Sequence, residues 1–425
     1  MEQYFANRSL IDYARCVTLW TEYESAVSKN SISAALAQLI PEHPALCCNI
    51  TVSRDNRPTA VSVLRKLTLN DVVVFQNGEE SLSELSQSLV NVRFEYDKDD
   101  APLWKLVVYN SRFLFFVLDH SIFDGVSARI FLSQLAVGIT AHPENATFPE
   151  HIDIPSGMCP PPVFEKLVKI DPPMFYVLKA VLGELIPVWL RPKSTRNIVL
   201  YNPVAISTPD GKHHIRAFSV EESRGFLEKS RENEVTVTAL LAEALCVAFG
   251  QTFDDAMDVT LDIVFDARRF IPESAVFSDP SKLIGPYVGR HQSLIKRTTE
   301  FSWTEAAEIG KDLKNGVNLS ALYESSMIKY LNGKIQEWLR GKIGKVPNGD
   351  IEVSNVGAVH FPDSVTAFGF AQCYGVTNLP VTINVSSVKG GKLSITLVTA
   401  DSIIGSGNGD KLWENFQRVM EGALN

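Results

Sequence analysis

One histidine in the chain stands in a pattern that could perform acid–base chemistry. His120 opens the sequence His-Ser-Ile-Phe-Asp-Gly, in which Asp124 and Gly125 follow at fixed spacing. With eight histidines in the chain, a chance match to His-x-x-x-Asp-Gly is expected on the order of 0.03 times. A neutral imidazole can remove the proton of an attacking hydroxyl, which contributes roughly 10²–10⁴ in rate. The pattern therefore makes His120 a candidate general base.

A structural interpretation of the same residues stays open beside the chemical one. His120 could be a core histidine whose hydrogen bonds are satisfied, as buried polar groups usually are. Asp124 could cap the following helix, because a carboxylate accepts hydrogen bonds from helix N–H groups. The rarity of the pattern and its position between two regular elements favour the chemical role.

The elements around His120 would place it at the end of a buried strand. The six apolar residues 113–118 are too few for a membrane span but fit a strand covered on both faces. After Asp119, His120 and a short turn, an almost wholly apolar helix is predicted over 126–139. A strand end of this kind is where a rigid scaffold presents side chains to a cleft.

Length and composition set the scale of the fold and exclude some functions. The 425 residues, 45% of them hydrophobic, can form two cores, so we expect two domains of about 200 residues. The net charge of -9 argues against nucleic acid as a partner. The six cysteines lack metal-binding spacing and are expected to be reduced. No signal peptide or membrane span is predicted, so we expect a cytoplasmic monomer, with peripheral membrane association left open.

The distribution of prolines suggests where the two domains meet. Residues 1–155 and 211–425 each alternate predicted strands and helices, which indicates an α/β protein. Residues 156–210 contain many prolines and are expected to form a crossover between the domains. One apolar helix, predicted over 174–190, interrupts that stretch and is expected to pack against the body of the protein.

Several segments together resemble the fungal alcohol O-acetyltransferase family, whose relatives include plant acyl-CoA transferases and the condensation domains of peptide synthetases. The resemblance rests on an opening Glu-x-Tyr-Phe-x-x-Arg-x-Leu helix and on motifs farther along: Glu2–Leu10, Tyr13–Val17, His120-x-x-x-Asp124-Gly125, Asp266-x-Arg268-Arg269 and Ser354-Asn355-Val356-Gly357. It implies two chloramphenicol-acetyltransferase-like domains, each a mixed sheet with helices, with an active-site tunnel between them and His120 near its middle.

The resemblance also implies roles for individual residues. Asp124 would be structural, pairing with Arg268, or alternatively with Arg269, to fix the loop that aims His120. Gly125 would complete the motif as a turn residue.

Ser354 and Asn355 could hydrogen-bond the oxyanion of a tetrahedral intermediate. They could equally form a turn at the end of a strand, where Asn and Gly are common. The CoA-binding residues cannot be named from the sequence.

The implied function is transfer of an acyl group, most simply acetyl, from acyl-CoA to an alcohol hydroxyl. Acyl-CoA would be a co-substrate, with no permanently bound cofactor and no metal, and the acceptor would be a small-molecule alcohol. Two alternatives remain: transfer from a carrier-protein thioester or to an amine, and a binding protein that keeps the fold without the chemistry. Asp119 stands where condensation domains usually carry a second histidine, which makes peptide-bond formation the weaker alternative.

Overall fold

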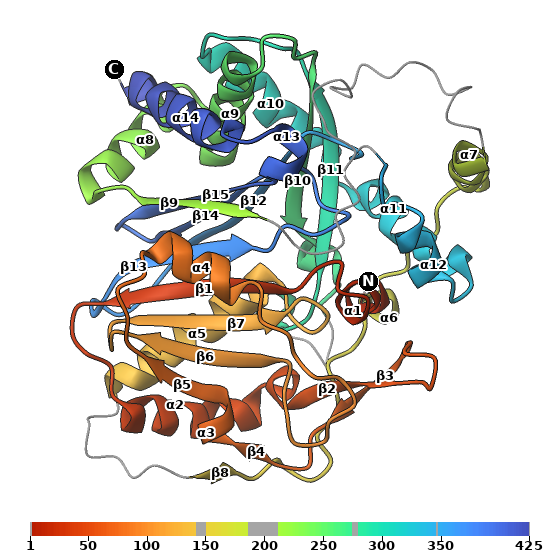
Figure 1. The fold of residues 1–425 in the computed structure, drawn as a ribbon, viewed down its shortest axis with the longest axis vertical. Coiled ribbons are helices and arrows are strands. Elements are labelled where there is room, and N and C mark those ends of the chain that lie inside the picture. Colours follow the sequence, from red (N-terminus) through yellow and green to blue (C-terminus); the bar gives the residue numbers. More distant parts are fainter. Residues whose placement is uncertain (1, 142–149, 186–210, 274–278, 346, 425) are drawn as a thin grey trace.

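The computed structural model describes residues 2–141, 150–185, 211–273, 279–345 and 347–424. Two mixed β-sheets lie one above the other, with helices on their outer faces (Figure 1). The five-stranded sheet has the order β13-β1-β7-β6-β5, and the six-stranded sheet has the order β11-β10-β12-β14-β15-β9. Two short ribbons, β2-β3 and β4-β8, complete the described strands. The predicted α/β class with two mixed sheets is confirmed.

The elements of the first half carry the His120 motif. In chain order they are α1 (Glu2–Leu10), β1 (Cys16–Tyr23), α2 (Lys29–Glu42), η1 (Pro44–Cys47), β2 (Cys48–Val52), β3 (Pro58–Val63), β4 (Leu67–Thr68), α3 (Leu69–Val72), β5 (Val73–Gln76), α4 (Leu82–Leu89), β6 (Trp104–Tyr109), β7 (Phe113–Asp119), α5 (Gly125–Ala141), β8 (His151–Ile152), α6 (Phe164–Leu167) and α7 (Met174–Leu185).

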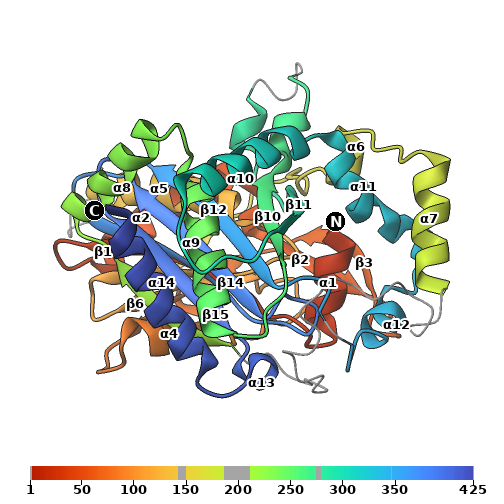
Figure 2. The same ribbon diagram turned by 90° about the horizontal axis from the view of Figure 1, so that it is seen from above.

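The second half supplies the six-stranded sheet and the helices above it. Its elements are β9 (Lys212–Ala217), α8 (Val220–Glu232), α9 (Val237–Thr252), β10 (Val259–Asp266), η4 (Ala267–Phe270), η5 (Pro280–Lys282), β11 (Val288–Ile295), α10 (Trp303–Gly316), η6 (Leu319–Leu322), α11 (Tyr323–Ser326), η7 (Met327–Leu331), α12 (Ile335–Arg340), β12 (Ile351–Val359), β13 (Val365–Gln372), β14 (Val381–Val388), β15 (Leu393–Thr399), α13 (Asp401–Ile404) and α14 (Asn408–Leu424). Seen from above, α9 and α14 lie across this sheet (Figure 2).

Strand β7 is buried on both faces, as its apolar run predicts. Leu114, Phe116 and Leu118 belong to the core beneath α2 and α5. Phe115 and Val117 point to the other face, into a smaller core beneath α4. The alternation of a strand sends successive side chains to opposite faces, so only a continuous apolar run can fill both cores.

The two sheets do not divide the chain at the expected boundary. Strand β13 comes from the second half of the sequence, yet it pairs with β1 from Val17↔Gln372 to Tyr23↔Val365 and so completes the first sheet. The edge of the first sheet thus carries residues from the far end of the chain. This exchange brings the strand end at Gln372 to the junction between the two sheets.

The helix within the Pro-rich crossover differs from the prediction in its packing. The predicted helix 174–190 appears as α7, and residues 186–210 lie outside the described residues. The prediction that this helix packs against the body is wrong for one face of it, since Met174 is 80%, Phe175 79%, Leu178 55% and Leu182 49% exposed. Among the described helices no single one is long and apolar enough to cross a membrane, and the bent pair α8 and α9, at 99°, passes by length and composition only.

Candidate active site

His120 lies in the turn that follows β7, where the sequence places it. Its imidazole is half-buried and stacks on the ring of Phe5 in α1, with the ring centroids 4.0 Å apart and the planes 7° from parallel. The enclosed Nδ1 has no hydrogen-bond partner among the described residues. A satisfied core histidine, the structural alternative, would have such a partner.

The surroundings of His120 favour the neutral imidazole. Burial lowers its pKa below the ordinary value because it disfavours the charged form, and the positive charge of Arg8 acts in the same direction. The carboxylate of Asp124 opposes this shift without reversing it. At neutral pH the residue is therefore in the form that can accept a proton.

Asp124 fulfils both structural roles that the sequence offers for it. Its Oδ1 accepts a hydrogen bond from the backbone N–H of Ser127 at 2.6 Å, and its backbone oxygen accepts from Ala128, so it caps α5. The same carboxylate forms a two-pronged ion pair with Arg268, Nη1 to Oδ2 at 2.8 Å and Nη2 to Oδ1 at 2.9 Å. The N–H of Tyr287 adds a fourth bond at 2.9 Å. Capping and pairing are thus not alternatives here.

Arg268, and not Arg269, is the partner from the second half. The Arg268 side chain is 1% exposed and that of Asp124 is 0% exposed, whereas Arg269 is exposed. Burial alone would raise the pKa of Asp124, but the charge and hydrogen bonds of Arg268 hold it below the ordinary value. A buried, doubly hydrogen-bonded pair of this kind joins α5 of one half to the turn after β10 of the other.

The sequence analysis missed two residues that complete this junction. The hydroxyl of Ser127 donates to the backbone oxygen of Gly285 and accepts from the Gly285 N–H and from Arg268 Nη2, all within 2.8–2.9 Å. Tyr287 lies beneath the Arg268 guanidinium, which is 4.9 Å from the ring centroid. Ser127 follows Asp124 by three residues, the spacing of a helix cap, but nothing in the sequence connects residue 287 with it.

Gly125 has a packing role in place of the turn role expected for it. It is the first residue of α5, and a Cβ there would lie 2.6 Å from Cγ1 of Val356 in β12. Only glycine permits so close an approach between the motif helix and the second sheet. The contact also shows that the segment Ser354–Gly357 lies beside the His120 motif.

Ser354 and Asn355 face in different directions from β12. Asn355 donates from its amide to Thr238 Oγ1 at 2.9 Å and accepts from the Gly357 N–H at 2.8 Å. These bonds hold a bulge, where the β12–β14 register shifts and Gly357 has a φ of +80°. Ser354 is 6% exposed, shares the strand face of Val356, and its hydroxyl has no hydrogen-bond partner among the described residues. Of the two, Ser354 keeps its side chain free for an oxyanion.

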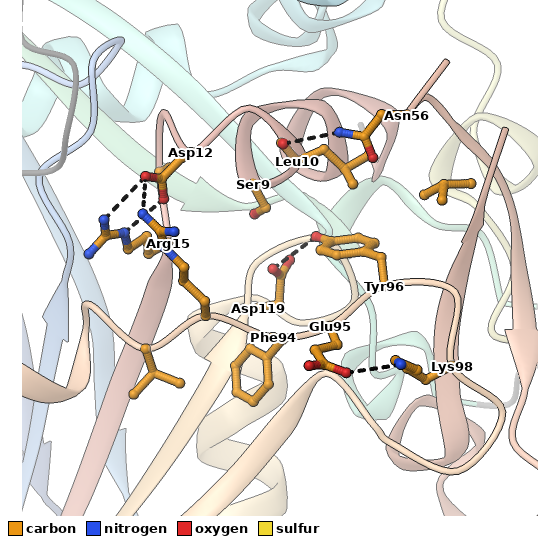
Figure 3. Close-up of a pocket in the computed structure, with 14 residues that line it drawn as sticks. Ser9, Leu10, Asp12, Arg15, Asn56, Phe94, Glu95, Tyr96, Lys98 and Asp119 are labelled. Atoms are coloured by element: carbon orange, nitrogen blue, oxygen red, sulfur yellow. Dashed lines mark hydrogen bonds and ion pairs between the residues drawn. The ribbon is translucent and has the colours of Figure 1, made fainter. Parts of the chain in front are cut away.

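A surface pocket of about 440 Å³ lies beside Asp119, the last residue of β7 (Figure 3). Its wall includes Asp12, which is ion-paired with both Arg15 and Arg93. Its lining also includes Tyr96, whose hydroxyl donates to Asp119 at 2.9 Å. All of its lining residues come from positions 9–119, and His120 is not among them. This pocket is therefore not the predicted inter-domain tunnel, which stays a prediction.

The fold has been seen before in acyl-transferring and condensing proteins. Trichothecene 15-O-acetyltransferase TRI3 from Fusarium sporotrichioides superposes with a TM-score of 0.69 at 12% identity, covering 100% of this chain and 93% of that one. The epimerization domain from the third module of tyrocidine synthetase B gives 0.63 at 13% identity, covering 99% and 94%. These similarities show that the chain has the two-sheet fold of those proteins.

The sequence narrows the class to one family. The alcohol acetyltransferase family model matches residues 1–420, so the chain belongs to that family. An uncharacterised protein of Schizosaccharomyces pombe is 25% identical, covering 99% of this chain and 94% of its own. The Fusarium pseudograminearum protein called "Probable alcohol acetyltransferase FCK4" is 21% identical, with 90% and 84% covered.

Proposed function

We propose that this acyltransferase moves an acyl group, acetyl in the simplest case, from acyl-CoA to the hydroxyl of an alcohol, with His120 as the general base. The observation that carries the proposal is the neutral, half-buried imidazole, which is held at a strand end beside the buried Asp124–Arg268 pair. Family membership supports the acyltransferase class. Beyond that class, we propose the acyl donor, the acceptor and the role of His120 as base.

In the proposed reaction His120 carries the proton of the alcohol to the thiolate that leaves. His120 takes the hydroxyl proton as the alcohol oxygen bonds to the thioester carbonyl carbon, and the carbonyl oxygen becomes an oxyanion. The hydroxyl of Ser354 donates a hydrogen bond to that oxyanion. Collapse of the intermediate breaks the carbon–sulfur bond, and the imidazolium returns the proton to the departing thiolate. The products are an ester and free CoA.

The deciding experiment supplies purified protein with labelled acetyl-CoA and a panel of alcohols, sterols and amines. Turnover of at least one alcohol should fall by two or more decades in His120→Ala, with the urea unfolding midpoint unchanged. His151→Ala is the matched control, because His151 is exposed and distant in the chain from every site residue named above. Near-normal turnover in folded His120→Ala protein would refute the proposal.

The two alternatives give different results in the same assay. A carrier-dependent enzyme would be inactive with free acetyl-CoA and active once a carrier-protein thioester is supplied. An amine-specific enzyme would acylate only the amines of the panel. A binding protein that keeps the fold would transfer nothing from either donor, and its affinity for ligands would be insensitive to His120→Ala.

A further inference from the structure

His120 occupies the second position of a four-residue turn, in which the N–H of Ile122 donates to the backbone oxygen of Asp119 at 3.4 Å. The carboxylate of Asp119 closes the same turn from its side chain. Its Oδ1 accepts from the N–H of Ser121 at 2.9 Å and from the Ser121 hydroxyl at 2.5 Å. An aspartate that bonds the N–H two residues ahead forms an Asx turn, which restricts the residue between them. The restricted residue is His120.

Tyr96 holds the same carboxylate from the other side. Its hydroxyl donates to Asp119 Oδ2 at 2.9 Å (Figure 3). Burial and the negative charge of Asp119 raise the pKa of Tyr96, so the hydroxyl keeps its proton at any ordinary pH. The segment around Tyr96 is fastened to β2 by hydrogen bonds of 3.0 Å to Asn49 and to the backbone of Ile50. Asp119, which is 3% exposed, therefore connects the turn to a fixed part of the first half.

The same turn occurs elsewhere in the chain without a charge. Asn318 Oδ1 accepts from the N–H of Ser320 at 2.9 Å and from its hydroxyl at 2.5 Å, which are the two distances found at Asp119. Asn318 is exposed, and its amide oxygen alone holds that turn. The turn at His120 therefore needs an acceptor oxygen at position 119 and does not need a negative charge there.

The ring of Phe5 shows where the turn places the imidazole. The centroids of the Phe5 and His120 rings lie 4.0 Å apart, with the planes 7° from parallel. Because Phe5 belongs to α1 and His120 follows β7, the rings stack only if the turn directs the imidazole at α1. A displacement of the turn by about 1 Å would disturb the stack, and misplacing a catalytic group by that distance can cost about 10²-fold in rate.

We propose that Asp119 and Tyr96 are positioning residues, which hold the turn so that the imidazole of His120 is aimed at the acceptor hydroxyl. Neither side chain needs to touch the substrate, since both act through the backbone of the turn. The inference rests on the proposed function, because it takes His120 as the base. It adds a constraint from within the first half of the chain to the one that the Asp124–Arg268 pair supplies from the second half.

The test measures the position of the imidazole and the turnover of the same variants. In protein labelled with ¹³C at histidine Cε1, the His120 resonance is identified by its absence in His120→Gln. The ring current of Phe5 displaces this resonance, and Phe5→Leu gives its position without the stack. Asp119→Ala should move the resonance toward that position and lower kcat by about 10²-fold, with little change in KM for the thioester. Asp119→Asn should leave both near the wild-type values, because the amide oxygen still accepts from Ser121.

Tyr96→Phe keeps the bonds within the turn and removes only its connection to Tyr96, so it is the second variant where Asp119→Ala does not fold. It should move the resonance in the same direction and lower kcat by about tenfold, the size of one hydrogen bond to a charged group. Asn318→Ala is the matched control, because it removes the same two bonds at an exposed site, and it should change neither quantity.

Two results would overturn the inference. One is a wild-type resonance and kcat in folded Asp119→Ala protein or, where that variant does not fold, in Tyr96→Phe. The other is an Asp119→Asn protein as impaired as Asp119→Ala, which would assign the effect to the charge and not to the turn.

The resonance separates this inference from the proposed function, since it needs no turnover. If the wild-type protein acetylates no alcohol, but Asp119→Ala moves the His120 resonance and Asp119→Asn does not, the reaction fails and the positioning of the imidazole stands. If His120→Ala abolishes turnover while Asp119→Ala leaves the resonance and kcat unchanged, the reaction stands and the positioning role fails.

Discussion

The Asp124–Arg268 pair gives the sharpest test of how the motif works. In Asp124→Asn one oxygen can still accept from Ser127, so the helix cap survives at little cost. The new NH₂ group, however, must face donors that now point at the carboxylate, either Arg268 Nη1 with the Tyr287 N–H or Arg268 Nη2 with the Ser127 N–H. Removing one charge of a buried ion pair costs roughly 3–5 kcal/mol, because the other charge stays buried without a partner.

The expected loss is therefore about 3–5 kcal/mol in the free energy of unfolding, measured by urea denaturation, together with a large fall in kcat/KM. Asp266→Asn is the matched control, because Asp266 also accepts from Arg268 Nη1, at 2.9 Å, but its side chain is 33% exposed. That change should cost about 1 kcal/mol or less.

A double-mutant cycle isolates the pair. Arg268→Met added to Asp124→Asn should cost much less than the sum of the two single changes, since it removes the donor left facing the new amide. Stability should also depend on pH through Asp124. Its pKa is lower folded than unfolded, so its contribution is present above the unfolded pKa and is lost as the pH falls through the folded pKa. Strict additivity, or a stable and active Asp124→Asn protein, would show that Asp124 is only a cap.

Three further predictions concern single residues. Ser354→Ala should lower kcat by tenfold or more with little change in KM for the thioester, as expected for a contact made in the transition state. Asn355→Ala should instead lower the free energy of unfolding, because Asn355 holds the bulge in β12. Steady-state kinetics and urea titration distinguish the two variants, and an unchanged kcat in Ser354→Ala would contradict the oxyanion role. Gly125→Ala should destabilise by roughly 1–3 kcal/mol and should be partly rescued by Val356→Ala, because the added methyl group meets Val356; absence of rescue would exclude that contact as the cause. Burial lowers the pKa of His213 to about 3, so the protein should lose about 1.4 kcal/mol of stability per pH unit as the pH falls from about 6.5 toward 3, and denaturant titrations should show a shallower loss for His213→Gln.

Features that depend on local pattern could be predicted from the sequence. The apolar run 113–118, the helix after it and the position of His120 between them all follow from residue order. The Asp124–Arg268 pair could not be obtained in this way, because it joins positions 144 residues apart, and it came from the family resemblance. Arg8 shows the same limit, since its motif was visible while its hydrogen bond to Asn378 joins positions 370 residues apart.

Long-range pairing explains the misplaced boundary as well. Strand β13 has the apolar alternation of any half-buried strand, and nothing in its residues indicates which sheet it joins. Periodicity describes one element at a time, so it predicts that a strand exists but not its partner. The exposed apolar face of α7 is a related failure of prediction, because an apolar composition shows that a helix could be buried and not that a surface is available to cover it.

The contacts of Asp124 and Gly125 explain why these two residues are adjacent in the His-x-x-x-Asp-Gly motif. Asp124 must be the cap of α5 to hold its carboxylate against Arg268, and Gly125 must come next because the first helical residue touches Val356 of the second sheet. Both contacts fasten the start of α5 to the other half of the protein. His120 is joined to that fixed point by only three residues, so its position depends on how the two halves meet. A change that shifts the halves should therefore lower turnover even if it touches no substrate, and we expect Arg268, far from His120 in the chain, to help position the proposed base.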